Sequence, residues 1–195
     1  MMFKSIFKRG LLVGAVLIAG IGLPAITQGQ VFHSVRALLS EQFRSSERVS
    51  FLKVAPDSSA RARIEKRMGR KLPRADYTFY VASTGNRVDG YALFDEERGQ
   101  HELISFATFF DARGNITRVE VVAYREPYGD GIRAARFRNQ FIGRNASSGF
   151  RANDDIDAIS GATISSRSLS KGVQRASILL DEVVLRGGKT IVASR

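Results

Sequence analysis

The longest amphipathic pattern in the chain lies near its C-terminal end. Apolar residues recur there every three or four positions, at Leu169, Val173, Ala176, Leu180 and Val183–Val184. This is the period of one helix face, and Gly187-Gly188 ends it. The turn Ser160-Gly161-Ala162-Thr163 comes before the helix, and Thr163, Ser165 and Ser166 are candidate N-caps. We therefore expect Thr163 at the positive end of a helix of about five turns.

The middle of the chain has a different pattern, with short runs of β-branched and aromatic residues separated by turn residues. The predicted strands are Tyr77–Ala82, Gly90–Phe94, Leu103–Phe110 and Ile116–Tyr124. The segments 83–86 and 111–115 carry the Gly and Asn chemistry of hairpin turns. Strands joined by such short turns predict an antiparallel meander.

Further elements flank this meander. The pattern predicts helices over 35–43, 57–68 (closed by Gly69) and 133–141, and a strand over 49–54. The fold class is therefore α+β, an antiparallel sheet with helices packed on one face.

Residues 1–29 have the layout of a secretory signal peptide. Lys4, Lys8 and Arg9 precede an apolar run from Leu11 to Ile26, and small residues follow before Gln30. The alternative is an uncleaved membrane anchor, although the strongly apolar part is shorter than the ~20 residues of a spanning helix. We expect cleavage, a mature domain over 30–195, and a periplasmic or other extracytoplasmic location.

The composition restricts the partners. The formal net charge is +11, and the three cations and no anions of residues 1–29 leave +8 for the remainder. Such a balance favours anionic partners, and the run Arg61–Arg67 is a candidate docking surface. Nucleic acid is excluded by the absence of a recognition-helix or aromatic-basic pattern. The two histidines lie far apart in the sequence, so no metal site is predicted.

The turn before the last helix is a candidate anion site. Backbone N–H groups and the helix dipole would both point at the hydroxyl of Thr163, and a phosphate suits that position. Gly161 permits a backbone that a side chain would forbid. From spacing alone, a plain helix start remains the alternative.

The segment Asp157-Ala158-Ile159-Ser160-Gly161-Ala162-Thr163 is similar, position for position, to the D-x-x-S-G-A-T flavinylation motif of the FMN-binding domain family. That family includes the flavin-carrying C and G subunits of the sodium-pumping NADH:quinone oxidoreductase and the Rnf complex. In those proteins a flavin transferase takes FMN from FAD and joins its phosphate to the motif's last threonine. The resemblance implies covalent FMN on Thr163 and a recognition role for Asp157.

A second, looser resemblance follows the last predicted strand. Family members have an E-[TP]-x-G-type turn and then a helix ending in F-x-G, and this chain has Glu126-Pro127-Tyr128-Gly129 and Phe141-Ile142-Gly143. The resemblance implies that Glu126 and Tyr128 lie near the flavin ring, that Ser160, Gly161 and Ala162 surround the phosphate, and that Arg167 supplies a countercharge. The opening at Gln30 resembles small exported members of the family.

Two functions follow from these observations. In the first, the chain is an exported electron carrier, more an electron-transfer protein than an enzyme, whose partners are a flavin transferase and redox proteins of the membrane or periplasm. In the second, it is a non-redox scaffold whose basic surface docks a partner and whose Thr163 only begins a helix.

Overall fold

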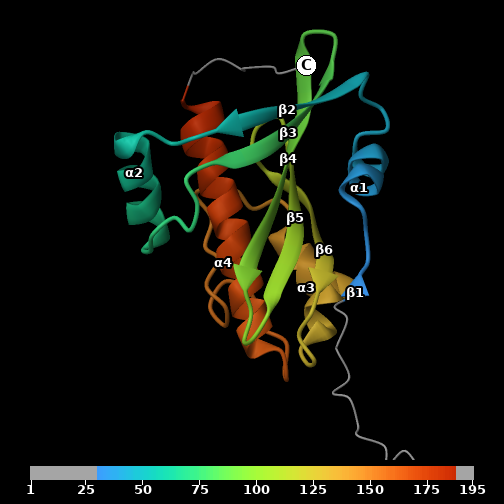
Figure 1. Ribbon diagram of the computed structural model, residues 1–195, viewed down its shortest axis with the longest axis vertical. Helices are drawn as coiled ribbons and strands as arrows, with labels where there is room; N and C mark the ends of the chain where they lie inside the picture. The colour runs from blue at the N-terminus through green and yellow to red at the C-terminus, as the bar shows by residue number, and fades with distance from the viewer. Residues whose placement is uncertain (1–29, 188–195) are drawn as a thin grey trace, which may run out of the picture.

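The computed structural model describes residues 30–187. The predicted signal peptide at 1–29 lies outside these residues. The described part contains a six-stranded sheet in the order β1-β6-β5-β4-β3-β2, and every neighbouring pair is antiparallel (Figure 1). The strands are β1 (Gln30–Val31), β2 (Arg48–Val54), β3 (Tyr77–Thr84), β4 (Arg87–Arg98), β5 (Leu103–Asp111) and β6 (Ile116–Tyr124). The α+β class and the meander from β3 to β6 are confirmed.

Four strands, β2 to β5, are longer than the sequence pattern predicts, β4 by the most, and β1 was not predicted at all. β4 continues through the charged residues Asp95 and Glu97. Asp95 is buried there because arginines bind its carboxylate, an arrangement that no local strand pattern can indicate. β1 has only two residues, too few for a period to show.

The helices are α1 (Val35–Gln42), α2 (Ser58–Met68), α3 (Ala135–Arg138) and α4 (Thr163–Leu179), with short 3-10 turns η1 (Asp130–Arg133) and η2 (Asn139–Phe141). A π-helical segment, η3 (Leu180–Leu185), extends α4. The predicted limits of α2 are confirmed: the Asp57 side chain accepts a hydrogen bond from the Ala60 N–H at 2.9 Å, and Gly69 takes the left-handed conformation at φ +66°.

The main core lies between the sheet and α4, with α2 and α3 at its sides (Figure 1). The predicted apolar face of α4 is confirmed, since Leu169, Val173, Ala176 and Leu180 are fully buried. Gly172 lies where this helix crosses β5, and a Cβ there would come within 2.6 Å of the Phe106 ring atom Cε1. The closeness of α4 to the sheet therefore depends on a residue without a side chain.

Helix α1 lies on the opposite face of the sheet, so the prediction of helices on one face only is wrong in this respect. Leu38 and Leu39 of α1 and its C-cap residue Phe43 form a second, smaller core with Phe109 and the alanines of the central strands. An amphipathic pattern shows that a helix has one buried side. It does not show which face of the sheet that side covers.

The single helix predicted over 133–141 is also wrong. Ala134 has ψ 134°, an extended conformation that separates η1 from α3, and η2 then replaces the last helical turn. The spacing of Phe137 and Phe141 still reflects burial, because both rings are in the core with centroids 5.6 Å apart. A connector of short turns can bury the same apolar residues as a continuous helix.

Within residues 30–187, no helix combines the length and the hydropathy that crossing a bilayer requires.

Candidate functional site

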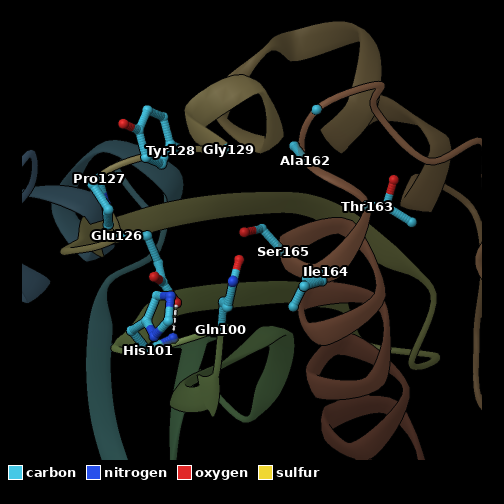
Figure 2. Close-up of a pocket in the computed structure, with 11 residues that line it drawn as sticks. Gln100, His101, Glu126, Pro127, Tyr128, Gly129, Ala162, Thr163, Ile164 and Ser165 are labelled. Carbon is cyan, nitrogen blue, oxygen red and sulfur yellow. Dashed lines mark hydrogen bonds between the residues drawn. The ribbon is translucent and has the colours of Figure 1, made fainter.

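Three segments that are distant in the sequence meet at one end of the sheet: the β4–β5 turn, the chain after β6, and the start of α4. A cavity of about 360 Å³ lies between them (Figure 2). It is lined by Gln100, His101, Glu126, Pro127, Tyr128, Gly129, Gly161, Ala162, Thr163, Ile164 and Ser165. We call it the α4 pocket.

The first turn of α4 borders this pocket without a side-chain cap. Ala162 is the N-cap residue, and within residues 30–187 no side chain accepts a capping hydrogen bond there. Thr163 is therefore the first residue of the helix, as predicted. Its hydroxyl and those of Ser165 and Ser166 are not caps, which corrects the expectation. Because the first N–H groups of a helix have no acceptor within it, this end of α4 suits an anion.

Two of the nearby hydroxyl groups have other partners. Ser166 Oγ accepts a hydrogen bond from the Ile159 N–H at 3.1 Å, and Ser165 Oγ lies 2.8 Å from the Tyr124 hydroxyl. Both serines are buried, whereas Ser160 and Thr163 are exposed. Only these last two hydroxyls of the turn are accessible to a reacting molecule.

The turn itself depends on Gly161. Its φ is +75°, a left-handed conformation that costs other residues about 1–2 kcal/mol. No heavy atom lies within 4 Å of the position that a Cβ would occupy. The glycine is therefore needed for backbone conformation rather than for close packing, and the space beside it is open.

Tyr124 connects the end of β6 to α4. Its hydroxyl donates a hydrogen bond to the Tyr128 carbonyl at 2.5 Å and also contacts Ser165. Burial raises the pKa of this phenol, and the neighbouring Glu126 and Asp130 carboxylates add to the effect. A Cβ on Gly129 (φ +89°) would lie 2.8 Å from the same hydroxyl. Tyr124 thus holds the 126–129 turn against the start of the helix.

Glu126 and Tyr128 differ in their surroundings. Glu126 is buried, and its Oε1 accepts hydrogen bonds from the backbone N–H groups of His101 at 2.7 Å and Glu102 at 3.1 Å. The carboxylate therefore stabilises the turn between β4 and β5 by binding two of its backbone N–H groups. The Tyr128 side chain is 83% exposed and extends from the opposite edge of the pocket from Thr163 (Figure 2).

The structure brings five of the eight predicted site residues to the α4 pocket: Glu126, Tyr128, Gly161, Ala162 and Thr163. The other three lie outside its lining. Ser160 is the exposed residue just before Gly161. Asp157 is exposed, and its backbone N–H and carbonyl bind the Gln140 side chain at 2.7 and 3.2 Å. Arg167 lines a different cavity.

Sequence reasoning missed several residues of the pocket, above all Gln100 and His101. The signal that could have found them is topological. In an antiparallel meander, the turn between β4 and β5 lies at the same end of the sheet as the end of β6. The 99–102 turn therefore had to lie beside Glu126.

The pocket fits the two parts of a flavin nucleotide. The uncapped helix start, with the hydroxyl of Thr163, suits the phosphate. Pro127, Tyr128 and Ile164 offer apolar surface for a planar ring, and Tyr128 and Ile164 are both exposed.

The structure is thus an α+β domain with a ligand-sized pocket at the start of its longest helix. Residues 99–177 match the model of the family described as FMN-binding domain. This stretch contains every residue that lines the α4 pocket. The match confirms the resemblance to the FMN-binding domain family that the motif indicates.

Two components of redox complexes are similar to this chain. It is 30% identical over 105 residues to the G subunit of the proton-translocating ferredoxin:NAD(+) oxidoreductase complex of Clostridium ljungdahlii, covering 50% of this chain and 57% of that protein. It is 26% identical over 200 aligned positions to the G subunit of the ion-translocating oxidoreductase complex of Pseudomonas aeruginosa, covering 89% and 87%. The matched region thus spans little more than half of the clostridial protein.

Among solved structures, the NqrC protein of Shewanella oneidensis is similar, with a TM-score of 0.47 and 16% sequence identity. The similarity covers 70% of this chain and 80% of that one.

Proposed function

We propose that this chain is a flavoprotein electron carrier that holds FMN covalently, through a phosphoester to Thr163. The observation that carries the proposal is the uncapped start of α4, where the motif's last threonine is the first residue of the helix, is exposed and lies at the edge of the α4 pocket. The family match over 99–177 and the similarity to components of redox complexes support it. Bound FMN would supply the exchange of one or two electrons.

The attachment step requires a second protein, a flavin transferase that uses FAD. The Thr163 oxygen would form a bond to the phosphorus of the FMN half, and the P–O bond to the AMP half would break. AMP leaves with that electron pair, and the hydroxyl proton passes to a base of the transferase. The product phosphodiester would carry a negative charge at the helix N-terminus, which contributes about 0.3–1 kcal/mol.

The surroundings of the turn explain why one hydroxyl would be chosen. Ser165 and Ser166 are buried and hydrogen-bonded, so they cannot reach a transferase. Ser160 is exposed but precedes Gly161, outside the helix. Among the hydroxyls of the turn, Thr163 alone is both exposed and placed where the helix N–H groups would bind the new phosphate.

The test is to co-express the chain with a flavin transferase and to measure flavin fluorescence in a denaturing gel, with the intact mass. Thr163→Val keeps the branched shape and removes the nucleophile, so the band should lose its fluorescence while the protein stays folded. Ser160→Ala is the matched control and should keep the flavin. A fluorescent Thr163→Val band would refute the assignment, and a dark wild-type band would favour the scaffold function.

Asp157→Asn tests recognition by the transferase. The carboxylate has no hydrogen-bond or ion-pair partner among residues 30–187, and only the backbone of this residue binds Gln140. The substitution should therefore leave the unfolding free energy unchanged within about 0.5 kcal/mol and slow flavin attachment. Normal labelling of Asp157→Asn would show that the transferase does not recognise the carboxylate of Asp157.

We also propose that residues 1–29 direct export and are removed near Gln30. The basic, apolar and small-residue order of the segment supports this proposal. N-terminal sequencing of the protein from the periplasmic fraction should begin near Gln30. Recovery of an intact Met1 from the membrane fraction would favour the anchor instead.

A further inference from the structure

A second cavity, of about 630 Å³, lies between the C-terminal end of α2, the loop at 150–154 and the N-terminal half of α4. The buried residue Phe150 is part of its lining, and most of its charged residues are cations. Four of them have exposed side chains: Lys66 of α2, Arg151 of the loop, and Arg167 and Lys171 of α4. Asp154 is the one acidic residue among those that line it. We call this the basic cavity.

These cations differ from the other basic residues of α2. Arg63 and Arg67 of the predicted docking run bind the carboxylates of Asp181 and Glu182 at 2.7–2.9 Å and so tie α2 to η3. By contrast, Lys66, Arg167 and Lys171 have no ion pair with any residue in 30–187, and Arg151 reaches only Asp154, at 4.0 Å. The positive charge of the basic cavity is therefore not neutralised within the described domain.

The basic cavity continues the side of α4 on which Thr163 lies. With 3.6 residues per turn, Thr163, Arg167 and Lys171 fall within an arc of about 80° on the helix. Figure 2 shows Thr163 on the flank of α4 that faces away from His101 and Glu126. Arg167 and Lys171, one and two turns after Thr163 on this flank of α4, line the basic cavity.

We propose that the basic cavity binds an acidic segment of the flavin transferase, the protein partner that modifies Thr163. This proposal rests on the proposed function, because it assigns the partner's docking surface beside the same attachment site. Carboxylates spaced along a polypeptide match cations that come from three separate elements. Electrostatic complementarity of this kind raises association rates and orients the partner.

Two other anionic partners fit the cavity less well. A compact phosphate would need convergent, buried donors, and these four cations are long, exposed side chains. A lipid surface would need apolar side chains to insert. None of the large exposed apolar residues of the described chain, such as Phe51 and Tyr128, lines this cavity.

The test uses the full chain and a fluorescein-labelled hexaglutamate peptide, whose binding is followed by anisotropy at low salt. The triple variant Lys66→Gln/Arg167→Gln/Lys171→Gln should bind the peptide at least tenfold more weakly. The matched control removes the same net charge from the α1–β2 side, by Arg36→Gln/Arg44→Gln/Arg48→Gln, three exposed arginines that line another groove. It should change the affinity less than threefold.

Three results would overturn the proposal. Equal losses in the two triple variants would mean that only net charge matters. Unchanged peptide binding in the cavity variant would exclude the cavity. Cavity-dependent binding of pyrophosphate, or of vesicles containing phosphatidylglycerol, without peptide binding would replace the acidic segment by a phosphate ligand or a lipid surface.

Flavin attachment provides an independent measurement. At low salt the cavity variant should be labelled by the transferase more slowly than the control, and the difference should shrink at high salt because exposed charges are screened. A wild-type chain without flavin fluorescence would refute the assignment of flavin to Thr163. It would leave the assignment of the basic cavity standing, since peptide binding does not depend on flavin.

Discussion

Arg175 is the most deeply buried charged residue of the described chain, and its removal tests how α4 is fixed to the sheet. Its side chain is 0% exposed. Nε donates to Asp95 Oδ2 at 2.8 Å, Nη1 to Glu97 Oε2 at 2.5 Å, and Nη2 to the Glu96 carbonyl at 2.7 Å. One guanidinium therefore binds three consecutive residues of β4.

The substitution Arg175→Met keeps most of the side-chain length and removes the charge. Breaking one partner of a buried ion pair costs about 3–5 kcal/mol, because the other charge stays buried. Asp95 is 1% exposed but keeps hydrogen bonds from Arg74 and from the Glu96 N–H. We therefore expect the lower end, about 3 kcal/mol, which corresponds to a fall in Tm of about 6–12 °C for a domain of this size.

The assay is urea unfolding of the domain over residues 30–195, followed by circular dichroism. Arg70→Met is the matched control, since Arg70 contacts the same Glu97 carboxylate at 3.0 Å with a side chain that is 26% exposed. Exposed pairs contribute about 0–1 kcal/mol, and this half-buried pair should lie between them and the fully buried Arg175. A loss below about 1 kcal/mol for Arg175→Met, or equal losses for the two variants, would refute the argument from burial.

Three further changes have defined outcomes. Gly172→Ala should destabilise the fold by about 1 kcal/mol, since overpacking against Phe106 outweighs the gain in helix propensity; a compensating Phe106→Leu should recover part of the loss in a double-mutant cycle. Burial opposes ionisation of Glu182, but hydrogen bonds from two arginines of α2 outweigh it and hold its pKa below the ordinary 4.5. Its stabilising effect should be full above pH 4.5 and disappear as the pH falls through the lowered pKa, so the difference in unfolding free energy between wild type and Glu182→Gln should shrink from pH 6.5 to pH 3; a constant difference would contradict this. Tyr124→Phe should cost about 1 kcal/mol by removing the hydrogen bond to Tyr128, and hydrogen exchange should rise in the 126–129 turn first.

Local patterns predicted those parts of the fold that depend on local chemistry. The period of α4, the caps of α2 and the glycine-containing hairpin turns are properties of neighbouring residues, and they are confirmed. The D-x-x-S-G-A-T segment likewise placed Thr163 at a helix start. The chemical role of this threonine in flavin attachment stays a prediction.

The features that the sequence did not predict depend on contacts between distant segments. Arginine side chains are mostly exposed, yet Arg175 of α4 is buried because β4 supplies carboxylates 78 and 80 residues away. The resemblance implies Arg167 as a countercharge to the phosphate, yet its exposed side chain lines another cavity, together with the loop at 150–154 and α2. The side of the sheet that α1 covers is decided by the alanines of the central strands, which no local period describes.

The short pairing of β1 with β6 has a practical consequence for experiments. Gln30 lies opposite Tyr124, so the described chain starts at the end of the sheet that holds the α4 pocket, whereas η3 ends at the far end of the domain (Figure 1). A purification tag or a surface linker joined ahead of Gln30 would stand beside the pocket and compete with any molecule approaching it. A tag or linker attached after Leu185, at the far end of the domain, would leave the pocket accessible. Protein that is immobilised for binding measurements should therefore be attached at that end.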